Sequence, residues 1–195
     1  MPTGVALRDP RQRLFDAAER VLLRAGATGL TSRAVTEEAG VAKGVLHRHF
    51  ADFDAFLVEL VLDRIARVGA QATTLRESAG TGTVAGNLTG ALTTLFEPVM
   101  VAIVALVIAR DELRTRLRRA GTARFPLVGE GTAMIAGYLT AERDLGRIAP
   151  DADVDTLAPT LIGAAHLLYS ERGGSPPKTG AVGKVVATVL TGATR

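Results

Sequence analysis

The sequence contains no cysteine and no tryptophan, and only 4% of its residues are aromatic. Without cysteine the chain can form neither a disulfide framework nor a thiolate metal site. Its only histidines are His47, His49 and His166, so a zinc site would need carboxylate ligands as well. There is also no H-E-x-x-H motif and no nucleophile elbow. We therefore expect a protein that is not an enzyme and that uses no metal and no cofactor.

Long apolar runs are also missing. The longest, residues 99–109, is too short to cross a bilayer and predicts a buried helix instead. Residues 1–13 lack the apolar core of a signal peptide. These absences predict a cytoplasmic protein without a membrane partner.

Positive charge is concentrated at one end of the chain. The formal net charge is +3, and residues 1–50 hold eight Lys and Arg against five Asp and Glu, whereas the remaining residues are balanced. An excess confined to one region indicates that a polyanion meets that region. Because the excess is only three charges, chance remains an alternative explanation.

Apolar residues recur at helical spacing, and no segment alternates with the period of a strand. An Asp9-Pro10 pair supplies an N-cap and a first helical residue. The helices expected from these patterns span residues 10–26, 32–39, 42–50, 52–77, 84–96, 99–110, 125–145, 151–172 and 178–191, with a flexible joint at 78–87. The prediction is an all-α fold. Its N-terminal three-helix domain, residues 1–52, contains a helix-turn-helix and is joined by a long helix to a C-terminal antiparallel helical domain, residues 53–195.

Residues 31–50 have the spacing of a DNA-reading helix-turn-helix. Gly40 stands where the turn needs a positive φ, and Val41 is the apolar residue that anchors the turn. The second helix exposes side chains that suit base edges and phosphates, and Arg33 begins the first helix. The candidate DNA contacts are Arg33, Lys43, Gly44, Val45, His47, Arg48 and His49. A helical hairpin with a basic, solvated face is the alternative.

Two ordered motifs then carry a resemblance to a known family. They are L-T-S-R-x-V and E-A-G-V-A-K-G-x-L-x-R-H-F, within residues 11–60, which is about a quarter of the chain. This segment resembles the N-terminal domain of TetR-family transcriptional regulators. The resemblance adds Ser32 to the expected DNA contacts. The sequence departs from the family pattern at Ala42, His47 and Phe53. The family usually has Ser or Thr at the first of these positions, Tyr at the second and Lys at the third. These departures weaken the expectation of phosphate contacts.

The resemblance also implies a homodimer and a small-molecule effector. The last two long helices are the dimer candidates, through Leu157, Leu161, Ala165, Leu168, Val182, Val186 and Val189. The candidate effector contacts are Phe96, Met100, Ile103, Val104, Val107, Phe125, Met134, Tyr138 and His166, and this lining suits an apolar or aromatic ligand.

The expected function is a ligand-responsive repressor that binds a palindromic double-stranded DNA operator as a dimer and is released by its effector. The alternative is an architectural DNA-binding protein without an effector. An activator is a third possibility that the sequence leaves open.

Overall fold

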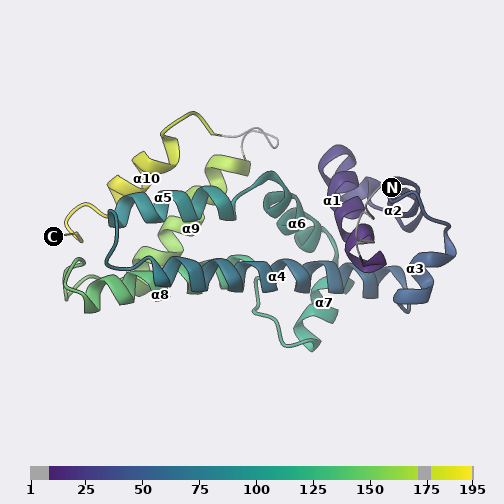
Figure 1. The fold of residues 1–195 in the computed structure, drawn as a ribbon, viewed down its shortest axis with the longest axis horizontal. Coiled ribbons are helices and arrows are strands. Elements are labelled where there is room, and N and C mark those ends of the chain that lie inside the picture. The colour runs from purple at the N-terminus through teal and green to yellow at the C-terminus, as the bar shows by residue number, and fades with distance from the viewer. Residues whose placement is uncertain (1–8, 171–176, 195) are drawn as a thin grey trace, which may run out of the picture.

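The computed structural model describes residues 9–170 and 177–194. This part of the chain folds into ten α-helices, and its sole β-type pairing is an isolated bridge between Ile148 and Thr194 (Figure 1). The helices are α1 (Pro10–Gly29), α2 (Ser32–Glu38), α3 (Gly44–His49), α4 (Phe53–Glu77), α5 (Val84–Leu95), α6 (Pro98–Ala109), α7 (Asp111–Arg119), α8 (Val128–Asp144), α9 (Val154–Ser170) and α10 (Ala181–Val189). The predicted all-α class is confirmed.

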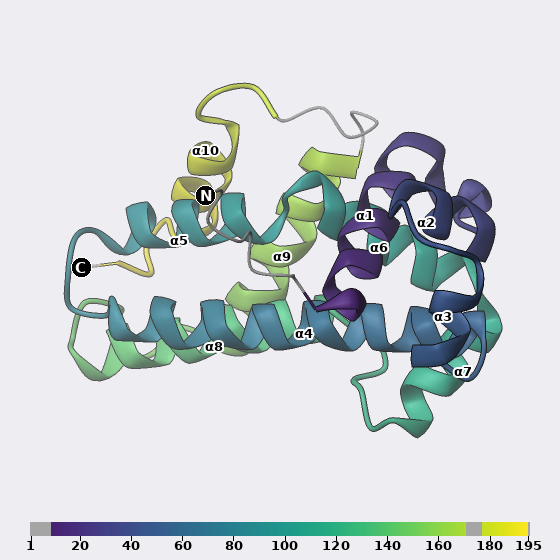
Figure 2. The ribbon, with the colours of Figure 1, turned by 45° about the vertical axis from the view of Figure 1, so that its right-hand side comes forward.

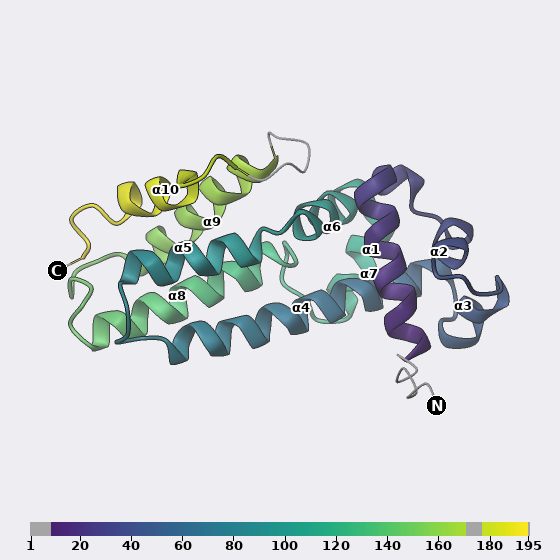
Figure 3. The ribbon, with the colours of Figure 1, turned by 45° about the horizontal axis from the view of Figure 1, so that its top comes forward.

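The molecule is elongated, and α4 runs along much of its length (Figures 1 and 3). Helices α1, α2 and α3 gather around the N-terminal end of α4, while α5, α8, α9 and α10 surround its C-terminal half. Helix α8 packs along α4 and against α9, and α6 packs against α1. One long helix therefore connects the two ends of the structure, as the sequence predicts.

Local capping explains where several helices begin. Asp9 accepts a hydrogen bond from the Arg11 amide at 3.0 Å, and Pro10 occupies the first turn of α1. Thr83 caps α5 through the Gly86 amide, also at 3.0 Å. These short polar side chains satisfy amide groups that have no partner within their own helix.

Several boundaries differ from the sequence-based expectation, including both ends of α10, which was expected at 178–191 and spans Ala181–Val189. Helix α1 continues past a kink at Gly26, where φ is 66°, and ends at Gly29. Helix α8 begins at Val128 instead of residue 125, because Leu127 adopts a φ of 71° and the Glu130 side chain accepts from its amide at 2.5 Å. Helix α9 is described from Val154 to Ser170, and the last two residues of the expected 151–172 helix lie outside the described residues.

None of the individual helices in the described ranges has both the length and the apolar character needed to span a bilayer. Helices α5 and α6 meet those criteria only when taken together, and they are bent by 59° relative to each other.

Candidate nucleic-acid interface and effector cavity

The α2–α3 unit has a short turn whose geometry depends on glycine. Thr31 caps α2 by accepting a hydrogen bond from the Ala34 amide at 3.2 Å. Gly40 adopts a φ of 64°, a conformation that residues with a Cβ rarely enter. The Val41 amide then donates to the Thr36 carbonyl at 3.0 Å, and the Val41 side chain packs against the core. The turn predicted at Gly40 and Val41 is therefore present.

Helix α3 lies at the outer edge of the molecule (Figure 3). Its His47, Arg48 and His49 side chains are exposed. Leu46 is fully buried and anchors the helix to the core. No side chain caps α3, and its N-cap is Lys43 instead of Ala42, the position expected from the sequence. Of the eight predicted DNA contacts, Ser32 and Val45 are half-buried and the others are exposed, namely Arg33, Lys43, Gly44, His47, Arg48 and His49.

Ion pairs fix the first helix of this unit on α1. Glu38 of α2 accepts from Arg20 at 2.7 Å and from Arg24 at 2.9 Å. These two guanidinium groups lower the pKa of the Glu38 carboxyl. Arg33 pairs with Glu37 one turn away at 2.7 Å and remains highly exposed. Its guanidinium therefore has to leave an exposed partner before it can reach DNA, and exposed pairs of this kind cost little to break.

A cluster of four phenylalanines lies beneath the α2–α3 unit. The ring of Phe56 is 5.6 Å from Phe15, 5.1 Å from Phe50 and 5.6 Å from Phe53, centroid to centroid. The guanidinium of Arg110 lies 5.8 Å from the centre of the Phe53 ring. Phe53, one of the three departures from the family pattern, is thus half-buried in this cluster, and the first turn of α4 shares a core with α1 and α3.

Two arginines, Arg110 at the end of α6 and Arg116 on α7, connect α6 and α7 to the N-terminal helices. Arg110 donates to the Leu30 carbonyl at 3.1 Å, and Arg116 donates to both Asp52 oxygens at 2.9 and 3.0 Å. Asp52 also caps α4 through the Ala55 amide at 2.6 Å, and this amide together with Arg116 lowers the pKa of Asp52. Helix α7 lies beside the start of α4 (Figure 2). Sequence analysis missed this contact, because partners 64 residues apart leave no local pattern.

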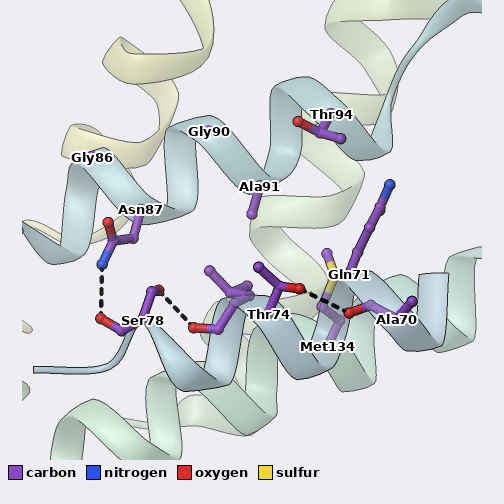
Figure 4. Close-up of a pocket in the computed structure, with 11 residues that line it drawn as sticks. Ala70, Gln71, Thr74, Ser78, Gly86, Asn87, Gly90, Ala91, Thr94 and Met134 are labelled. Carbon is purple, nitrogen blue, oxygen red and sulfur yellow. Dashed lines mark hydrogen bonds between the residues drawn. The ribbon is translucent and has the colours of Figure 1, made fainter. Parts of the chain in front are cut away.

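A cavity of about 500 Å³ lies between the C-terminal half of α4, α5 and α8 (Figure 4). It is lined by Ala70, Gln71, Thr74, Leu75, Ser78, Gly86, Asn87, Gly90, Ala91, Thr94 and Met134. Its volume falls in the range typical of small-molecule sites. Among the predicted effector contacts, Met134 alone lines it. Sequence analysis missed the others because isolated polar and small residues on a helix form no recognisable motif.

The remaining predicted effector contacts lie in separate parts of the structure. Tyr138 lines a second cavity of about 390 Å³, which Met134 shares. Val104, Val107 and Phe125 line a third cavity of about 340 Å³ near the start of α8. The other four side chains pack in or against the core, with Met100 and Ile103 on α6 and the rings of Phe96 and His166 6.0 Å apart.

A buried polar network closes the far end of α8 against the α4–α5 turn. Glu142 is fully buried and accepts from the Tyr138 hydroxyl at 2.5 Å and from the Gly80 amide at 3.2 Å. Asn87 donates to the same hydroxyl at 2.9 Å, and Arg147 lies 3.4 Å from Glu142. Burial, followed by the hydrogen bond to Glu142, raises the pKa of Tyr138. The phenol is therefore engaged by protein partners.

The predicted dimer contacts on α9 and α10 divide into two groups. Four of them, Leu161, Ala165, Val182 and Val186, are buried within the single chain. The other three, Leu157, Leu168 and Val189, are half-buried. The outward face of α9 instead presents Pro159, Gly163 and Leu167, the last of which is 60% exposed.

Comparison with known proteins finds a family match in the N-terminal part of the chain. Residues 14–60 match the model of the family described as "Bacterial regulatory proteins, tetR family". These 47 residues include most of α1, the whole α2–α3 unit and the first turns of α4. The similarity to this family is therefore shown for the part of the chain that presents α3. No curated protein sequence matches the chain.

Solved structures extend the likeness in fold to almost the whole chain. A transcriptional regulator from Rhodococcus sp. Rha1 has a TM-score of 0.70 at 21% identity, covering 94% of this chain and 97% of that one. FadR from Bacillus subtilis, solved with stearoyl-CoA, has a TM-score of 0.69 at 15% identity, covering 93% and 98%. The ketosteroid regulator KstR2 of Mycobacterium tuberculosis has a TM-score of 0.62 at 24% identity, covering 97% of each chain.

Proposed function

We propose that this protein is a TetR-family repressor that binds a palindromic DNA operator as a dimer and leaves it when a small, uncharged effector binds. The main support for this proposal is the α2–α3 unit. A rigid turn at Gly40 precedes an exposed segment that presents Lys43, His47 and His49. A single such helix reads only a half-site, so a palindrome requires two copies spaced by one turn of DNA, about 34 Å.

Helix α4 supplies a physical connection between effector and operator. It begins at Asp52, its cap beside α3, and Gln71 of the 500 Å³ cavity lies about 27 Å further along its axis. A ligand that favours a different tilt of α4 moves α3 relative to its partner. A coupling free energy of about 1–3 kcal/mol corresponds to a change in operator affinity of about five- to 150-fold.

The cavity favours an effector-controlled regulator over an architectural DNA-binding protein, which needs no internal site. Among the proteins of similar fold, one was solved with an acyl-CoA and another is named for a ketosteroid. In this proposal residues 1–52 form the DNA-binding domain and residues 53–195 bind the effector and form the dimer. Helix α6, through Arg110, and helix α7, through Arg116, give the effector domain a second contact with the DNA-binding domain.

We place the dimer interface on the outward faces of α9 and α10. The buried residues predicted for the interface hold these two helices on the core, and exposed side chains such as Leu167 form the contact. Leu167 is one of five exposed large apolar side chains in the described residues, and it is the one that lies on the outward face of α9.

Operator binding is tested by selecting binding sites from a random DNA pool and footprinting the selected sequences. We expect a short protected palindrome. Lys43→Ala should weaken binding to all sequences and reduce the slope of log affinity against log salt by about one. Arg76→Ala, which also removes one exposed positive charge but lies near the C-terminal end of α4, should leave affinity unchanged. Binding that is independent of sequence, with a steep salt slope and no footprint, would instead favour the architectural alternative.

The dimer is tested by sedimentation of Leu167→Glu. In the proposed interface this change places two carboxylates near the two-fold axis, and the dissociation constant should rise at least about a hundredfold. Leu145→Glu introduces the same charge at a residue of similar exposure at the end of α8 and should leave the dimer intact. A Leu167→Glu protein that remains dimeric would exclude this face as the interface.

A further inference from the structure

One lining group of the cavity between α4, α5 and α8 has an unsatisfied hydrogen-bonding atom. Gln71 extends from α4 towards α5 (Figure 4), and its side-chain oxygen is buried without a hydrogen-bond partner among the described residues. Buried polar atoms are almost always paired, so this unpaired oxygen beside the cavity is an exception that needs a partner. Because an amide oxygen only accepts, the partner must bring an O–H or N–H donor.

Of the other four polar side chains that line this cavity, Thr74, Ser78 and Asn87 already donate to the protein, and Thr94 is exposed to solvent. The Thr74 hydroxyl donates to the Ala70 carbonyl at 3.3 Å, and the Ser78 hydroxyl donates to the Leu75 carbonyl at 2.7 Å. The Asn87 amide donates to Tyr138, as described above, and to the carbonyl of Thr81 at 2.9 Å. Gln71 is therefore the group best placed to discriminate between ligands.

No charged residue lines this cavity. An ionised ligand would gain no counter-ion from this lining, which disfavours carboxylates and phosphates relative to uncharged ligands. The 390 Å³ cavity on the other side of Met134 differs, because Arg76 and Glu130 contribute to its lining. The lack of charge is thus a property of the larger cavity.

The wall formed by α5 is flat. Gly86, Gly90 and Ala91 face the cavity, and a Cβ added at Gly90 would meet no atom within 4 Å. Small residues leave a smooth surface of backbone and methyl groups against which a flat ring system can pack closely.

We propose that this cavity selects a flat, largely apolar and uncharged ligand bearing a hydroxyl or N–H group, and that Gln71 accepts the hydrogen bond that selects it. The inference rests on the proposed function, in which this cavity holds the effector.

The test compares three naphthalenes that differ in one substituent, namely 2-naphthol, 2-methoxynaphthalene and 2-naphthoate. Their dissociation constants are measured at pH 7 on the whole protein without DNA. We expect 2-naphthol to bind about fivefold more tightly than 2-methoxynaphthalene, which has no donor. It should bind at least about tenfold more tightly than 2-naphthoate, which is charged.

Two variants assign this selectivity to the cavity. Gln71→Met has nearly the same length and no amide, and it should lower the naphthol preference over the methyl ether to about twofold or less while binding the ether normally. Retained binding of the ether shows that this variant is folded. Gly90→Leu fills the space beside α5 and should weaken all three probes.

The proposal is overturned if 2-naphthoate binds as well as 2-naphthol, if Gln71→Met keeps the preference, or if Gly90→Leu leaves binding unchanged. Absence of binding by all three probes at millimolar concentration also overturns it. Because these measurements involve no DNA, they are independent of the operator experiment. Selective probe binding without operator recognition would disprove the proposed function and leave the ligand selectivity standing.

Discussion

Phe56→Ala is expected to lower the free energy of unfolding by about 3–5 kcal/mol. Phe56 is fully buried, and its ring meets three other phenylalanines from α1, α4 and the residue that ends α3. Truncation leaves a cavity in a core that holds the N-terminal helices together. The midpoint of urea unfolding should fall, and DNA binding should be lost with it.

Phe125 provides a matched control, because it is 66% exposed. Phe125→Ala should change the unfolding free energy by no more than about 0.5 kcal/mol. Equal effects of the two substitutions would mean that the phenylalanine cluster contributes little to stability.

Glu142→Ala should have the second largest effect, a loss of about 3 kcal/mol in unfolding free energy. The change leaves the Tyr138 hydroxyl and the Gly80 amide without their acceptor and Arg147 without its carboxylate. Arg147 is still partly exposed to water, so the effect lies at the lower end of the range for broken buried pairs.

Glu142→Gln separates the lost hydrogen bonds from the lost charge. It keeps an acceptor for Tyr138, and its effect should be about half as large. Glu77→Ala, at the exposed end of α4, is the matched control and should be neutral. Thermal or urea unfolding of the three variants measures these differences. A Glu142→Ala protein as stable as the control would show that the buried network is dispensable.

Local chemistry made much of this fold predictable from the sequence. The Asp9-Pro10 start of α1 and the Gly40 turn depend on neighbouring residues, and both are present in the structure. The start of α8 was placed wrongly because the backbone conformation of Leu127 is held by the Glu130 side chain. Long-range contacts were the main omission. The pairing of Arg116 with Asp52 depends on how distant helices pack, which no local pattern encodes.

The candidate DNA contacts were predictable because an exposed basic helix after a fixed turn is a local pattern. The cavity was not, because hydrophobicity identifies core residues and says nothing about where packing leaves space. Met100 and Ile103 illustrate this, since both were expected to line a cavity and both fill the core. Gln71 was missed because a single glutamine on a helix is indistinguishable from a surface residue.

Met134 separates the two cavities beside α4, since it lines both. An unbranched thioether has three rotatable bonds and repacks more readily than a branched aliphatic side chain. The side chain between the two cavities is therefore one that can readily change its conformation. A ligand too long for one cavity would contact Met134, and a change of the Met134 rotamer would give it more space. The largest ligand that fits therefore depends on the ligand as well as on the protein.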